Sequence, residues 1–114
     1  MNLDEQILKA SVLIVDDKPA NVALLEAILK SEGYTNIQSV TDSRLVKELH
    51  EKWQFDIILL DIRMPHMSGF EVMEQLQKSN QDDYLPVLVL TAQSDAEIKI
   101  QALQSGARDF VTKP

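Results

Sequence analysis

Three aspartates directly follow apolar runs of the sequence. Asp61 comes after the run at 57–60 and opens a loop that carries proline and glycine, while Asp16 and Asp17 come after the run at 12–15. A buried strand that ends in a carboxylate is the usual way in which an open α/β sheet presents a functional group. If the two runs form neighbouring strands, the three carboxylates meet at one edge of the sheet.

Such a cluster of carboxylates predicts a metal. Like charges at short range repel and raise one another's pKa unless a cation lies among them. Oxygen ligands supplied by loops suit a hard divalent ion such as Mg²⁺. The three aspartates therefore indicate a site in which a carboxylate, together with a metal ion, handles phosphate.

Composition narrows the class of protein. The 114 residues suit one domain, and the 45% hydrophobic and 25% charged content is ordinary for a globular protein. The absence of cysteine excludes disulfides and thiolate metal sites, and it suits a cytoplasmic location. No apolar stretch approaches the roughly 20 residues of a membrane span, and the N-terminus lacks the pattern of a signal peptide.

The net charge of -7 argues against nucleic-acid binding by this domain, because phosphate backbones need lysine and arginine. Part of the negative charge belongs to the acidic site itself. DNA binding by another segment of a longer chain is compatible with this charge.

Short apolar runs alternate with amphipathic ones along the chain. After a polar lead-in at 1–10 with a short helical turn, the predicted strands are 11–15, 36–40, 56–60, 86–90 and 109–112. The predicted helices run from Pro19 to a stop at Gly33, from Asp42 or Ser43 onward, from Ser68-Gly69 onward, and from a capping box at 94–97 to Gly106.

Apolar residues recur at helical spacing in each predicted helix and should face the sheet. They are Val22, Leu25, Ile28 and Leu29 in the first, Leu45, Val46, Leu49 and Trp53 in the second, Phe70, Met73 and Leu76 in the third, and Ile98, Ala102 and Leu103 in the fourth.

The βαβαβαβαβ order predicts an α/β fold: a doubly wound, five-stranded parallel sheet covered on both faces, with right-handed crossovers. The runs at 12–15, 57–60 and 87–90 show no polar alternation, as expected of strands buried on both faces. No fifth helix follows the last strand in this sequence. We therefore expect residues 11–114 to be one domain, either cut before its last helix or an unusually short version of the fold. Apolar side chains of the first helix and of strands one and five should then be exposed.

Four motifs follow successive predicted strands. They are Val15-Asp16-Asp17, Leu60-Asp61-Ile62-Arg63-Met64-Pro65 with Ser68-Gly69, Leu90-Thr91-Ala92, and the stretch from Gly106 to Lys113-Pro114. With these motifs in this order, the chain from about Ser11 onward resembles the receiver domain of bacterial two-component response regulators. The resemblance implies the flavodoxin-like strand order 2-1-3-4-5 and a switch driven by aspartyl phosphorylation.

The resemblance also implies roles for single residues. Asp61 would be the phosphoacceptor, and Mg²⁺ would be held by Asp16, Asp17, the Asp61 carboxylate and the backbone carbonyl of Arg63. The ion would screen the attacking carboxylate from the incoming phosphoryl group.

Two strand-end residues complete the implied site. The hydroxyl of Thr91 would hydrogen-bond a phosphoryl oxygen, and Lys113 would pair with the phosphoryl group, next to a Lys113-Pro114 bond that the resemblance makes cis. Phe110 would be an aromatic switch that works by ring packing, since it has no hydroxyl.

Each of these residues also has a purely structural interpretation. Asp17 could cap the first helix, and Thr91 could satisfy its hydroxyl locally. Lys113 could be a solvated lysine, and Phe110 a plain core or edge aromatic. The Arg63 side chain could be solvated or could pair with the phosphoryl group or an acid.

The loop after Asp61 contains further polar and apolar side chains. His66 could suggest a metal or phosphorelay role, but a loop position without a second histidine nearby indicates an exposed loop residue. Met64 and Met67 are expected to pack against the end of the sheet.

The resulting prediction is a signalling domain that accepts a phosphoryl group on Asp61 from a histidine kinase or phosphotransfer protein. It would catalyse only its own phosphorylation and dephosphorylation, without nucleic-acid or membrane binding. The fourth helix and fifth strand would then present a changed surface to an output domain or a second receiver.

One alternative is a metal-dependent phosphohydrolase, but Arg63 stands where such enzymes usually carry a second acid. The other is a degenerate receiver that serves only as a docking module.

Overall fold

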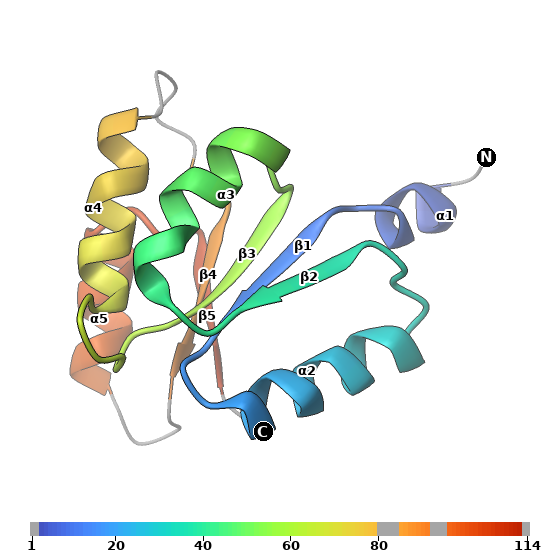
Figure 1. Ribbon diagram of the computed structural model, residues 1–114, viewed down its shortest axis with the longest axis horizontal. Coiled ribbons are helices and arrows are strands. Elements are labelled where there is room, and N and C mark those ends of the chain that lie inside the picture. Colours follow the sequence, from blue (N-terminus) through green and yellow to red (C-terminus); the bar gives the residue numbers. More distant parts are fainter. Residues whose placement is uncertain (1–2, 80–84, 92–95, 113–114) are drawn as a thin grey trace.

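The fold is a five-stranded parallel sheet, which the computed structural model describes over residues 3–79, 85–91 and 96–112. The strand order is β2-β1-β3-β4-β5, as predicted (Figure 1). The strands are β1 (Val12–Val15), β2 (Ile37–Val40), β3 (Ile57–Asp61), β4 (Val87–Thr91) and β5 (Asp109–Thr112). Both β3 and β4 reach one residue further than the sequence predicted, so that Asp61 and Thr91 are the last residues of their strands.

Helices cover both faces of the sheet. They are α1 (Leu3–Leu8), α2 (Pro19–Ser31), the 3-10 turn η1 (Ser43–Leu45), α3 (Val46–Trp53), α4 (Gly69–Ser79) and α5 (Ala96–Gln104). Helix α2 lies on one side of the sheet, and α3, α4 and α5 lie on the other (Figure 1). None of the helices in the described ranges has the length and apolar character needed to cross a membrane.

The central strands are buried on both faces, as their unbroken apolar runs predicted. Leu13, Leu60 and Val89 face the core under α3, α4 and α5. Ile14 and Leu59 face the core under α2. All four residues of β1 are buried, so the expectation that strand one would be left exposed is wrong. The cause is that α2 lies over β1 itself and covers its apolar side chains.

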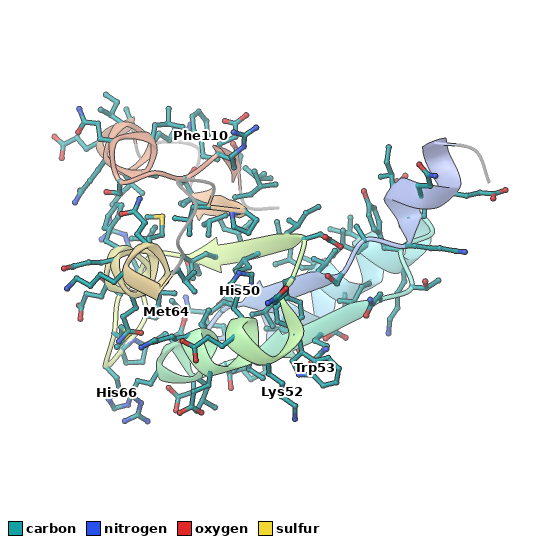
Figure 2. All side chains as sticks on the ribbon, turned by 90° about the horizontal axis from the view of Figure 1, so that it is seen from above. His50, Lys52, Trp53, Met64, His66 and Phe110 are labelled. Atoms are coloured by element: carbon teal, nitrogen blue, oxygen red, sulfur yellow. The ribbon has the colours of Figure 1, made fainter. Side chains whose placement is uncertain are left out.

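Two residues at the ends of α3 do not face the sheet as predicted. Leu45 is exposed because it belongs to η1, and the 3-10 geometry turns it away from the face that Val46 buries. Trp53 is 51% exposed because it is the last residue of α3, just before Gln54 ends the helix in a left-handed conformation. Figure 2 shows Trp53 pointing away from the sheet beside Lys52, whose Nζ lies 5.3 Å from the ring centroid.

Ile28 and Leu103 are also exposed, contrary to the sequence prediction. Each lies at the edge of its helix's apolar arc. In α2, Leu25 and Leu29 make the contact with the sheet, and in α5 the buried Ala102 takes that position. The prediction from helical spacing alone therefore gave these helices wider apolar faces than they have.

His50 closes the turn from α3 into β3. Its Nδ1 accepts a hydrogen bond of 3.1 Å from the backbone N–H of Phe55, and its ring stacks on the Phe55 ring. Burial lowers the pKa of His50, which matches the neutral form that an accepting Nδ1 requires. His50 is thus a structural residue of the core edge.

Candidate functional site

The three predicted aspartates meet at the carboxyl edge of the sheet. Strands β1 and β3 are neighbours, with Val15 aligned to Leu60, so the residues that follow come to the same level. One oxygen of each aspartate lies within 4.8 Å of the others. Asp16 and Asp61 are only 1% and 2% exposed, and Asp17 is half-buried. The cluster predicted from the sequence therefore exists.

Asp16 is held in place by the start of α2. Its Oδ1 accepts a 3.0 Å hydrogen bond from the backbone N–H of Lys18, and its Oδ2 accepts one of 3.2 Å from the side-chain amide of Asn21. Asn21 was not predicted from the sequence, where its only signal is its place in the first turn of the helix after the aspartates.

Asp17 is not the helix cap that its sequence position allowed. Helix α2 begins at Pro19, and the capping position is Lys18, one residue after Asp17. The Asp17 Oδ1 atom is buried and has no hydrogen-bond partner within the part of the chain that the structure describes. The capping interpretation of Asp17 is therefore wrong.

The aspartate cluster fits a divalent cation. Three carboxylates within 4.8 Å repel one another, and the buried Asp17 Oδ1 atom carries a desolvation cost that no hydrogen bond offsets. A hard cation with oxygen ligands, such as Mg²⁺, would relieve both. The residues present thus match the metal expected from the sequence.

Thr91 lies beside the cluster at the end of β4, in the strand next to β3. It is only 2% exposed, and its Oγ1 has no hydrogen-bond partner among the described residues. The interpretation in which its hydroxyl is satisfied locally is therefore wrong. A buried hydroxyl without a hydrogen-bond partner costs about 1–3 kcal/mol. An oxygen atom that binds at the cluster and accepts a hydrogen bond from Thr91 would remove this cost.

The loop after Asp61 folds tightly back onto the end of β3. A Cβ atom on Gly69 would lie 2.6 Å from the Asp61 carbonyl oxygen and 2.7 Å from Cδ1 of Ile62, so only glycine fits there. The N–H groups of Gly69 and Met64 donate to the Ile62 carbonyl at 2.9 and 3.1 Å. The Arg63 side chain is exposed. These backbone bonds fix both ends of the segment that contains Arg63, whose backbone carbonyl is a predicted metal ligand.

The middle of this loop is a tight turn at His66. His66 is exposed, as predicted, and has a positive φ of 68°, while the N–H of Met67 donates to the Pro65 carbonyl at 2.7 Å. Met64 and Met67 pack against the core, which confirms their predicted role. Figure 2 shows His66 pointing outward, far from His50, so the two histidines do not form a joint site.

Phe110 lies on β5, half-buried against the core under α5 (Figure 2). The Nζ atom of Lys99, on α5, lies 5.2 Å from the centre of its ring. Lys113, Pro114 and the predicted cis bond between them lie outside the described residues, as does Ala92.

The doubly wound parallel sheet, with an acidic cluster at its carboxyl edge, defines the class of receiver-type α/β domains. The family model described as "Response regulator receiver domain" matches residues 12–114. The chain therefore belongs to this family, whose general role is to accept a phosphoryl group.

Two relatives show how the domain is used in longer proteins. Response regulator PleD of Caulobacter vibrioides is 41% identical over 107 residues, which are 94% of this chain and 23% of PleD. The DNA-binding dual master transcriptional regulator RpaA of Synechocystis is 38% identical over 103 residues, which are 90% of this chain and 42% of RpaA. The chain thus spans less than half the length of either relative.

Solved structures confirm the fold. The Vibrio cholerae chemotaxis protein CheY4 superposes with a TM-score of 0.82 at 31% identity, over 93% of this chain and 88% of that one. The receiver domain of the sensor histidine kinase PA1611 from Pseudomonas aeruginosa gives 0.80 at 29% identity, over 93% and 86%. That structure has a magnesium ion coordinated in its active-site cleft.

Proposed function

We propose that Asp61 accepts a phosphoryl group from the phosphohistidine of a histidine kinase or phosphotransfer protein. The observation that carries this proposal is the convergence of Asp16, Asp17 and Asp61 within 4.8 Å at the ends of adjacent strands. The domain then acts as a cytoplasmic switch for an output domain or a second receiver. It catalyses only its own phosphorylation and dephosphorylation.

The transfer is a substitution at phosphorus. A carboxylate oxygen of Asp61 forms the new O–P bond while the N–P bond of the phosphohistidine breaks, and the imidazole keeps the electron pair of that bond. The three aspartates and the Arg63 carbonyl would hold Mg²⁺, which would supply neutralisation of the charge on the transferring oxygens. Asn21 and the Lys18 N–H keep Asp16 oriented, and Lys113 pairs with the phosphoryl group.

The phosphoryl group adds roughly -1.5 to -2 charges at the end of β3. Thr91 donates its unpartnered hydroxyl to a phosphoryl oxygen and thereby moves the end of β4. Helix α5 follows β4, and its Lys99 contacts Phe110 of β5, so α5 and β5 repack together. This repacking changes the surface that the next domain or partner binds.

The acceptor is tested with a small-molecule phosphodonor, such as acetyl phosphate, and Mg²⁺. Intact mass should increase by one phosphoryl group and return on hydrolysis. Asp61→Asn should abolish the increase, because an amide is a poor nucleophile. Asp109→Asn, which changes an exposed aspartate at the start of β5, is the matched control and should be labelled normally. Undiminished labelling of the Asp61 variant would refute the proposal.

A further inference from the structure

One buried polar side chain lies outside the site described so far. Among the described residues, the buried polar or charged ones are Asp16, Ser43, Asp61 and Thr91, and all except Ser43 belong to the acidic cluster and its threonine. Ser43 is the first residue of η1 and is 2% exposed. Burying a hydroxyl is unfavourable unless the hydroxyl forms a hydrogen bond. The hydrogen-bond partner of Ser43 therefore indicates why a serine is buried at this position.

The partner of Ser43 is the loop that follows the predicted phosphoacceptor. Its Oγ donates a hydrogen bond of 2.7 Å to the carbonyl oxygen of Met67, 24 residues further along the chain. The loop's own backbone bonds join Ile62 to Met64 and Gly69, and Pro65 to Met67, and all of them stay within the loop. Ser43 therefore supplies a bond from another element to the middle of the loop.

Ser43 lies in a short turn that its neighbours cap. Asp42 caps η1, with its Oδ1 accepting a 3.0 Å hydrogen bond from the backbone N–H of Arg44. The Arg44 guanidinium donates to both carboxylate oxygens, at 3.0 and 2.9 Å, and this pairing lowers the pKa of Asp42 to about 2. Asp42 thus caps the turn in which Ser43 lies.

The geometry points to Ser43 as a positioning residue for the metal site. Through Met67 it holds the 62–69 loop in the form that presents the Arg63 carbonyl beside Asp61. The metal ligands are then ordered before the ion arrives, and binding does not have to order the loop. This inference rests on the proposed function, because it assigns the loop to the Mg²⁺ site.

The test compares Ser43→Ala and Ser43→Cys, which remove a strong donor, with Ser43→Thr, which keeps a hydroxyl. Calorimetric titration with Mg²⁺ alone should show affinity about threefold to tenfold weaker in the first two, the usual effect of one hydrogen bond. Hydrogen exchange of the amides at 62–69 should become faster in the same two variants. Ser43→Thr should keep the Mg²⁺ affinity and the amide exchange at 62–69 close to those of the native protein.

Two controls separate positioning from general destabilisation. Ser31→Ala removes a hydroxyl-to-carbonyl bond of the same 2.7 Å length at the far end of α2, and it should leave Mg²⁺ affinity unchanged. Leu29→Val weakens the core under α2 and should lower thermal stability without changing exchange at 62–69. A Leu29 variant that matched the Ser43→Ala effects would overturn the inference.

The outcomes for Ser43 and for the proposed function are distinct. Unchanged exchange at 62–69 in Ser43→Ala would overturn the role of Ser43, whatever the labelling of Asp61 shows. Faster exchange and weaker Mg²⁺ binding, in a protein whose Asp61 is not labelled, would support Ser43 and refute phosphoryl acceptance.

Discussion

At the scale of single residues, two buried oxygen atoms distinguish the site from the rest of the core. Asp17 Oδ1 and Thr91 Oγ1 have no hydrogen-bond partner in the described part of the chain. Buried polar atoms in native proteins are almost always paired, and exceptions call for a functional explanation. A cation beside Asp17 and a phosphoryl oxygen beside Thr91 would supply the two missing partners.

Asp17→Asn tests the acidic residue. Because one charged ligand is lost, Mg²⁺ affinity should fall at least about tenfold, which corresponds to about 1.4 kcal/mol. Removing one of three crowded carboxylates should also raise the melting temperature of the metal-free protein. Calorimetric titration with Mg²⁺ and melting curves in the presence of a chelator measure the two effects. A lower melting temperature of the metal-free variant would show that Asp17 has a stabilising role instead.

At the scale of elements, the site depends on which strands are neighbours. Strand β3 lies between β1 and β4, so its last residue has aspartates on one side and Thr91 on the other. The chain continues from β4 to α5, whose Lys99 lies 5.2 Å from the Phe110 ring of β5. A shift at the end of β4 therefore has a direct structural connection to the α5 and β5 surface.

Thr91→Ala should separate phosphorylation from switching. The variant should still accept a phosphoryl group, because it leaves the nucleophile and the metal ligands intact. It should lose most of the response of α5, because the hydroxyl that couples the phosphoryl group to β4 is absent. Hydrogen exchange over 96–104, with and without beryllofluoride and Mg²⁺, measures this response.

Thr91→Ser keeps the hydroxyl and serves as the control, with an expected response close to the native one. A response of α5 that is equally large in the Ala and Ser variants would disprove the coupling.

The sequence predicted the elements and the acidic cluster because both depend on local patterns. Unbroken apolar runs mark strands buried on two sides, and Asp16, Asp17 and Asp61 directly follow such runs. The roles of Ser43 and Asn21 could not be predicted in this way. Ser43 meets Met67 only through the packing of two distant segments, and nothing in its local sequence marks that contact.

At the scale of the whole molecule, the two faces of the sheet are covered unequally. Helices α3, α4 and α5 cover one face, while α2 covers the other. Leu24 and Ile28 of α2 are exposed, and so is Val111 of β5, which is aligned with Leu90 of the core under α2. The sequence prediction of exposed apolar side chains thus holds for α2 and β5.

We propose that this exposed apolar side makes the 114-residue chain marginally stable or prone to self-association. Extending the chain by about 12–15 native residues, the length of an ordinary helix, should raise the melting temperature and suppress self-association. Light scattering and melting curves of both lengths give the comparison. The proposal fails if the 114-residue chain is monomeric and melts no lower than the extended one.

The most direct test of Asp61 as the phosphoacceptor is to locate the phosphoryl group in the phosphorylated protein. The phosphorylated protein is reduced with borohydride, which converts an aspartyl phosphate to homoserine, and is then mapped by peptide mass spectrometry. Homoserine is expected at position 61 alone, and only when both the phosphodonor and Mg²⁺ are present. Homoserine at Asp16 or Asp17, or a stable phosphate on a serine or threonine with Asp61 unmodified, would contradict it.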